Sequence, residues 1–208
     1  MIPSIQRTIK SYDIIAQDFG KVNFDFFWIN ELKIFKSLVR GKKILDIGCG
    51  TGRDVAMLIE SGFECTGIDA SQGMLKVASE RVLNGKFIKM DFYKLKFPNE
   101  TFDGFWAAAS FLHAPKNDIG IVLNEAKRVL KTGGIGFISL KQKMGIGEGT
   151  IKDTRYGNEI SRYFAFYEKK EFKNILRDFG LKVIKITTHL EKGIDKELLW
   201  LCYFVRKF

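Results

Sequence analysis

Three aspartates and a loop with alternating glycines are the residues whose types and spacing could do chemistry. A short apolar run leads into the loop Asp46-Ile47-Gly48-Cys49-Gly50-Thr51-Gly52, and Asp69 and Asp91 end the next two β-rich runs. A glycine-rich turn between a strand and a helix gathers backbone N–H groups at one point, which suits phosphates, carboxylates and closely packed nucleosides. Because ligands bind outside the carboxyl ends of parallel strands, we expect Asp46, Asp69 and Asp91 to share one site.

The elements that position these residues alternate between strand and helix. We expect strands at 43–47, 63–69, 86–90, 102–107 and 135–140, and helices at 53–61, 71–83 and 118–130. Helical crossovers of this length predict a parallel sheet with both faces covered. A helix at 169–179 and strands at 181–187 and 198–205 follow. The link at 190–197 is too short for a helical crossover, so we expect these last two strands to pair antiparallel.

The predicted fold class is therefore α/β, a three-layer αβα sandwich whose seven-stranded, mostly parallel sheet contains one antiparallel strand. We expect a single domain over 1–208, made of an N-terminal helical cap (1–40), a binding core (41–140), a substrate-covering loop (141–168) and a C-terminal helix with a strand pair (169–208). The cap is predicted as two helices broken near 18–26 around Gly20, with Gly41 closing the second. Thr132-Gly133-Gly134 is expected to close the helix at 118–130.

The spacing of the glycines discriminates between ligands. Dinucleotide sites use G-x-G-x-x-G, and here Arg53 stands where the third glycine would fall. No Gly-Lys-Ser/Thr of a phosphate-binding P-loop occurs. A dinucleotide is thus disfavoured, although an NAD-dependent oxidoreductase stays an alternative.

Four ordered motifs resemble those of class I methyltransferases, the Rossmann-like enzymes that use S-adenosylmethionine (SAM). They are the glycine loop, Gly67-Ile68-Asp69-Ala70-Ser71, Met90-Asp91-Phe92, and Phe102-Asp103 followed by Leu130-Lys131-Thr132-Gly133-Gly134. The likeness is close over residues 40–140, with Thr132 where the family turn has proline. It implies SAM as cofactor, S-adenosylhomocysteine as product, and no metal.

The resemblance also implies roles for individual residues. Asp69 would accept hydrogen bonds from the ribose hydroxyls and Asp91 from the adenine amine, with Phe92 near the ring; Asp46 would anchor the ammonium group. Arg53 could meet the carboxylate or lie in solvent. Tyr12, in Ser11-Tyr12-Asp13-Ile14-Ile15-Ala16, resembles an element that closes over the methionyl end, with helix packing as the alternative. The cofactor-binding set is predicted as Tyr12, Asp46, Gly48, Cys49, Gly50, Gly52, Arg53, Asp69, Ala70, Met74, Asp91, Phe92 and Ala107.

The acceptor side is less defined by the sequence. His113, after the fourth strand, could be a catalytic base, bind the substrate or pack the loop. Arg155, Arg162 and Tyr163 in the polar segment could bind an anionic substrate group or be solvated. His189 is expected at the surface. The region around His113 lacks the Asn/Asp-Pro-Pro-aromatic motif of enzymes that methylate nucleic-acid bases or glutamine amides.

Composition bounds the function class. The net charge is +10, but the lysines are interleaved with acids along the chain, so nucleic acid is possible and not favoured. Three scattered cysteines and the lack of a secretory or membrane segment predict a cytoplasmic protein without membrane contact, a monomer or homodimer. The leading hypothesis is methyl transfer to a small molecule. An RNA (tRNA) methyltransferase, favoured by the charge and a faint N-terminal likeness, and a SAM-binding protein without transferase activity are the alternatives.

Overall fold

The computed structural model describes residues 3–23, 27–143, 145–192 and 197–208. Seven strands form one sheet in the order β3-β2-β1-β4-β5-β9-β8. They are β1 (Lys43–Ile47), β2 (Glu64–Asp69), β3 (Lys86–Lys89), β4 (Phe102–Ala108), β5 (Leu130–Lys141), β8 (Leu181–Lys192) and β9 (Glu197–Lys207). All neighbours pair parallel except β9, which is antiparallel to both β5 and β8. The predicted α/β class and the single reversed strand are confirmed.

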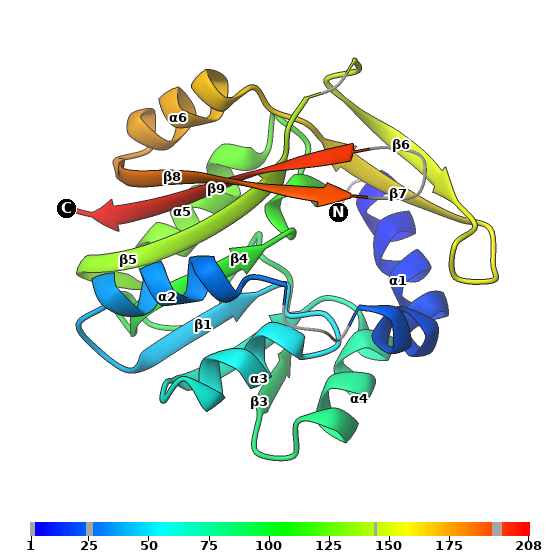
Figure 1. The fold of residues 1–208 in the computed structure, drawn as a ribbon, viewed down its shortest axis with the longest axis horizontal. Coiled ribbons are helices and arrows are strands. Elements are labelled where there is room, and N and C mark those ends of the chain that lie inside the picture. The colour runs from blue at the N-terminus through cyan, green and yellow to red at the C-terminus, as the bar shows by residue number, and fades with distance from the viewer. Residues whose placement is uncertain (1–2, 24–26, 144, 193–196) are drawn as a thin grey trace.

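Helices lie on both faces of the sheet, as Figure 1 shows with α2 in front and α5 behind. The crossover helices are α3 (Arg53–Glu60), α4 (Gln72–Arg81) and α5 (Ile119–Val129), while α2 (Ile29–Leu38) precedes β1 and α6 (Lys169–Asp178) precedes β8. The predicted cap of α4 is present, since the Ser71 hydroxyl accepts a hydrogen bond from the Met74 N–H. A short 3-10 helix, η1 (Phe111–His113), follows β4. The core is continuous through the sheet and includes Trp106 stacked on Phe137, with ring centroids 3.9 Å apart.

The segment predicted as a long loop, 141–168, instead contains an antiparallel hairpin of β6 (Glu148–Asp153) and β7 (Ile160–Ala165). The expectation of a loop was wrong because β6 carries no apolar alternation, and none of its residues is buried. Only β7 buries its side chains. The hairpin packs beside the long helix α1 (Pro3–Val22), and both stand together at one end of the sheet (Figure 1).

Two glycines expected to end helices make room for neighbours instead. Helix α1 continues through Gly20, where a Cβ would lie 3.0 Å from Val77 of α4. The helix therefore packs closely on α4 rather than breaking there; residues 24–26 of the expected break lie outside the described residues. Helix α2 ends at Leu38, before Gly41. At Gly41 a Cβ would collide with the Asp103 carboxylate, which accepts hydrogen bonds from the N–H groups of Lys42 and Lys43.

Two further expectations need correction. Helix α5 ends at Val129, so Thr132-Gly133-Gly134 lies within the start of β5 and does not close the helix. His189 was placed past its strand, at the surface. It lies in β8, with its ring 4.2 Å from that of Phe27. Strand β9 is internal, and Leu201 to Val205 are buried core residues.

Candidate active site

The glycine loop owes its shape to left-handed backbone. Gly48, Gly50 and Gly52 have φ of +77°, +54° and +85°, values that residues with a Cβ disfavour. The backbone conformation of the loop therefore favours glycine at each of these alternating positions. The N–H groups of Gly48 and Cys49 donate to the Ile68 carbonyl, 2.8 and 2.9 Å away, and tie the loop to β2. A Cβ on Gly48 would lie 2.4 Å from the Cβ of Ser110.

Gly50 differs from Gly48 in facing open space. A Cβ added there would have no described atom within 4 Å, and Gly50 lines a cavity of about 280 Å³. The loop therefore presents bare backbone to a space that a bound molecule can enter.

Asp69 connects the loop to the next strand. Its carboxylate accepts hydrogen bonds from the N–H groups of Gly50 (2.9 Å) and Ser71 (2.8 Å), and it lines the cavity. Burial raises the pKa of Asp69, while these two hydrogen bonds act in the opposite direction. Asp91 lines the same cavity and accepts from the Tyr93 N–H at 2.9 Å. The two aspartates thus stand at one edge of the sheet, as the strand ends predicted.

Asp46 lies beneath the loop. Its side chain is buried, and its Oδ2 accepts no hydrogen bond from any residue that the structure describes. Burial, followed by the nearby Asp54 carboxylate, holds the pKa of Asp46 well above its usual range. Arg53 is turned toward Asp54, with Nε 2.6 Å from Oδ1, and the Trp106 indole donates to the other oxygen of Asp54 at 3.0 Å. Asp54, which the motif analysis did not assign, therefore fixes Arg53 at the cavity wall.

Most of the predicted site residues line this one cavity. They are Tyr12, Gly48, Cys49, Gly50, Arg53, Asp69, Ala70, Met74, Asp91, Phe92, His113, Arg155 and Arg162. Asp46, Gly52, Ala107 and Tyr163 are not among the lining residues: Gly52 is the N-cap of α3, and Ala108 and Ala109 rather than Ala107 reach the cavity from β4. Ala109 has φ of +54°, an uncommon backbone conformation for a residue with a Cβ and one that often marks functional sites.

Sequence reasoning missed a further part of the wall. Lys141, Phe164, Trp200 and Glu191 also line the cavity. Lys141 directly follows the apolar run of β5, so the rule that found Asp69 at the end of β2 could have found it too. The other three come from strands β7, β9 and β8, whose approach to the site the sequence does not indicate.

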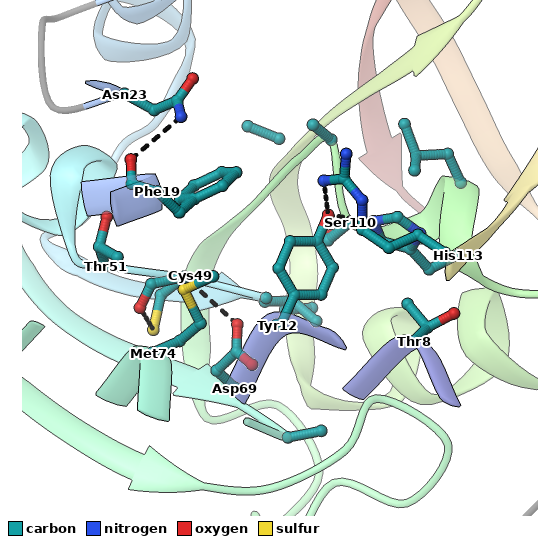
Figure 2. A pocket seen from close by; sticks show the side chains of 18 of the residues that line it. Thr8, Tyr12, Phe19, Asn23, Cys49, Thr51, Asp69, Met74, Ser110 and His113 are labelled. Carbon is teal, nitrogen blue, oxygen red and sulfur yellow. Dashed lines mark hydrogen bonds between the residues drawn. The ribbon is translucent and has the colours of Figure 1, made fainter. Parts of the chain in front are cut away.

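Tyr12 stands between the two sides of the cavity. Figure 2 shows it with Asp69 and Cys49 on one side and His113 on the other. Its hydroxyl lies 2.8 Å from Nε2 of His113, and Arg162 donates to it at 3.2 Å. Nδ1 of His113 lies 2.7 Å from the Tyr163 carbonyl, which can only accept, so Nδ1 carries the proton and Nε2 accepts from Tyr12. Neither ring nitrogen of His113 is free in this arrangement.

Burial lowers the pKa of His113 to about 3, so the ring is neutral near pH 7. A histidine whose pKa is lowered by folding contributes its full stabilisation above the pKa of the unfolded state, 6.5. This contribution is lost as the pH falls toward the pKa of the folded state. Between pH 6.5 and 4.5 the free energy of unfolding of the wild-type protein should therefore fall by about 2–3 kcal/mol more than that of His113→Gln. Urea unfolding of both proteins across this range checks the prediction.

His189→Gln is the matched control, because it removes the chain's other histidine. It should follow the wild-type curve. Parallel curves for the wild type and His113→Gln would show that His113 is not held neutral by burial.

Residues 44–134, from β1 to the start of β5, match the family model described as a methyltransferase domain. Residues 44–134 are a class I SAM-dependent methyltransferase domain.

Relatives of this methyltransferase domain include a demethylmenaquinone methyltransferase of Thermotoga maritima, 33% identical over 62% of the chain. The chain spans only 59% of the length of that relative. An uncharacterised protein of Methanocaldococcus jannaschii is 29% identical, and the match covers 89% of this chain and 87% of the length of that protein. Of the solved structures, the 1,6-didemethyltoxoflavin-N1-methyltransferase of Burkholderia thailandensis, bound to 1,6-didemethyltoxoflavin and S-adenosylhomocysteine, has a TM-score of 0.74 at 19% identity. The match covers all of this chain and 91% of the chain in that structure. At this identity it shows the fold alone.

None of the described helices has the length and apolar character needed to cross a membrane. Among the same residues, no group of three or more His, Cys, Asp or Glu side chains is placed to hold a metal ion.

Proposed function

We propose that this chain transfers the methyl group of SAM to a small-molecule acceptor and releases S-adenosylhomocysteine. The observation that carries the proposal is one cavity with two unlike halves. We call the lining by the glycine loop, Asp69 and Asp91 its first half and the lining by aromatic and cationic side chains its second half; Tyr12, hydrogen-bonded to His113, lines the same cavity. A cofactor half that shares one cavity with a lining of different chemistry suits a reaction between two bound molecules.

The residues of the first half fit SAM. Gly50 leaves space where a side chain would stand, and the buried Oδ2 of Asp46 lacks a donor that the ammonium group of SAM, directly or through water, could supply. Asp69 would hold the ribose hydroxyls, Asp91 the adenine amine and Arg53 the carboxylate. When bound, SAM supplies a methyl group activated by a positively charged sulfur.

The protein's own contribution is orientation and exclusion of water. Helix α1 and the β6–β7 hairpin cover the cavity, and the Ser11 hydroxyl donates to the Ser161 carbonyl at 2.8 Å between them. Because both nitrogens of His113 are engaged, we propose that His113 positions Tyr12 rather than taking a proton from the acceptor. Such a site suits an acceptor that reaches it already deprotonated or with a free lone pair, since a base is needed only for a protonated nucleophile.

Calorimetric titration with SAM, S-adenosylhomocysteine and NAD tests the proposal. We expect Kd values on the order of micromolar, about −8 kcal/mol, for the first two ligands and no binding of NAD. Binding of NAD alone would favour the oxidoreductase alternative. Absence of all binding would contradict the assignment of the glycine loop.

A further inference from the structure

The second half of the cavity lining is largely aromatic. Phe27, Trp28, Phe164 and Trp200 line it, and the rings of Trp28 and Trp200 meet edge to face with centroids 5.5 Å apart. The Trp200 indole N–H is satisfied by Glu191 at 2.8 Å, so this ring presents its apolar surface. Aromatic walls of this kind bind flat apolar molecules by contact and by exclusion of water.

Most charges around this wall are already paired. Asp153 accepts hydrogen bonds from both Arg155 and Arg162, and Arg162 also donates to Tyr12. Glu191 holds the Trp200 indole. These groups leave little capacity for a ligand without breaking contacts within the protein.

Lys141 is the exception. It ends β5 at the cavity wall, with Nζ 4.6 Å from the Phe164 ring centroid and 5.5 Å from that of Trp200. Within the described part of the chain this ammonium has no hydrogen-bond or ion-pair partner, and it lies against two aromatic faces. A half-buried cation held in this way retains its capacity to bind an anion.

We propose, resting on the proposed function, that the methyl acceptor is a flat apolar molecule with an anionic group, a carboxylate or an ionised phenol, and that Lys141 binds that group. The aromatic wall holds the body of the acceptor and Lys141 fixes its orientation relative to the cofactor half. A charge-assisted hydrogen bond from Lys141 would replace the water that the ammonium loses on closure of the chamber.

The electrostatic setting agrees with this role. Burial, with Arg162 and Arg155 adding repulsion and Glu191 and Asp153 opposing it, lowers the pKa of Lys141 to about 8. Burial keeps His113 and Tyr12, which also line the cavity, neutral near pH 7. An anion bound beside Lys141 would favour its protonated form, so binding should weaken as the pH rises above 8.

The test uses protein saturated with S-adenosylhomocysteine and three matched probe pairs: benzoate, 2-naphthoate and 4-biphenylcarboxylate, each against its neutral amide. Calorimetry should show at least one carboxylate binding tenfold or more tighter than its amide. Lys141→Met should remove that preference while changing S-adenosylhomocysteine affinity less than twofold. From pH 7 to 9.5 the carboxylate should bind about 30-fold more weakly to the wild type, as Lys141 loses its proton.

Two variants control for charge and packing. Lys141→Arg should keep the preference and lose its pH dependence, because arginine stays charged across this range. Lys152→Met removes the same charge from an exposed position on β6 and should behave as wild type. A wild-type protein without preference for any carboxylate, including one that binds no probe, would overturn the inference, as would a preference that survives in Lys141→Met. Failure to bind S-adenosylhomocysteine would instead overturn the proposed function and, with it, this inference.

Discussion

Replacement of Asp69 by asparagine is expected to weaken S-adenosylhomocysteine binding by about 10- to 150-fold, equivalent to about 1.5–3 kcal/mol. The carboxylate is placed by the Gly50 and Ser71 N–H groups at the edge of the cavity, where its remaining lone pairs can accept from a ribose diol. Asparagine keeps one acceptor oxygen but puts an N–H₂ where the second stood. Calorimetric titration at pH 7 measures the difference.

Asp178→Asn is the matched control for this experiment. Its carboxylate pairs with Arg177 at the surface, with 61% of its side chain exposed, so the same change of charge occurs away from the cavity. This variant should bind S-adenosylhomocysteine as the wild type does. Urea unfolding of Asp69→Asn separates loss of binding from loss of fold, and an unchanged affinity in a folded Asp69→Asn would remove Asp69 from the cofactor site.

The largest effect on stability is expected from Asp153→Ala, at about 3–5 kcal/mol. Asp153 accepts hydrogen bonds from Arg162, whose side chain is only 5% exposed, and from the side chain and backbone N–H of Arg155. Without the carboxylate, the Tyr12 hydroxyl is the one hydrogen-bond partner left to the buried Arg162 guanidinium among the described residues. Its Nε already lacks a hydrogen-bond partner among them. Urea unfolding measures the global loss, and hydrogen exchange of the β6–β7 amides shows whether the hairpin opens first.

The comparison of single and double variants tests the reason for this loss. Arg162→Met should cost less than Asp153→Ala, because Asp153 then keeps Arg155. The double variant should be more stable than Asp153→Ala by about 1 kcal/mol or more, since it no longer buries an unpaired charge. Asp178→Ala, at an exposed ion pair, should change stability by less than about 1 kcal/mol. Equal losses for both single variants, with simple addition in the double, would contradict an ion-pair origin.

The sequence alone determined the sheet, the reversed strand and the proposed cofactor half of the site. Its residues lie at the ends of consecutive apolar strands, and the rule that parallel strands present their carboxyl ends at one edge places Asp69 and Asp91 together without knowledge of side-chain packing. The positions of Gly48, Gly50 and Gly52 are readable for the same local reason, because each meets a backbone requirement within one turn.

Only the tertiary structure brought together the residues of the proposed acceptor half. Tyr12, His113, Lys141 and Arg162 come from α1, η1, β5 and β7, and their contacts join residues as much as 150 positions apart in the chain. Strand β6 has no apolar pattern of its own and forms because β7 offers it a backbone partner, so local preference did not reveal the hairpin. Likewise Gly20 and Gly41 serve close packing against α4 and Asp103, a role that depends on which distant side chains approach them and that no local spacing expresses.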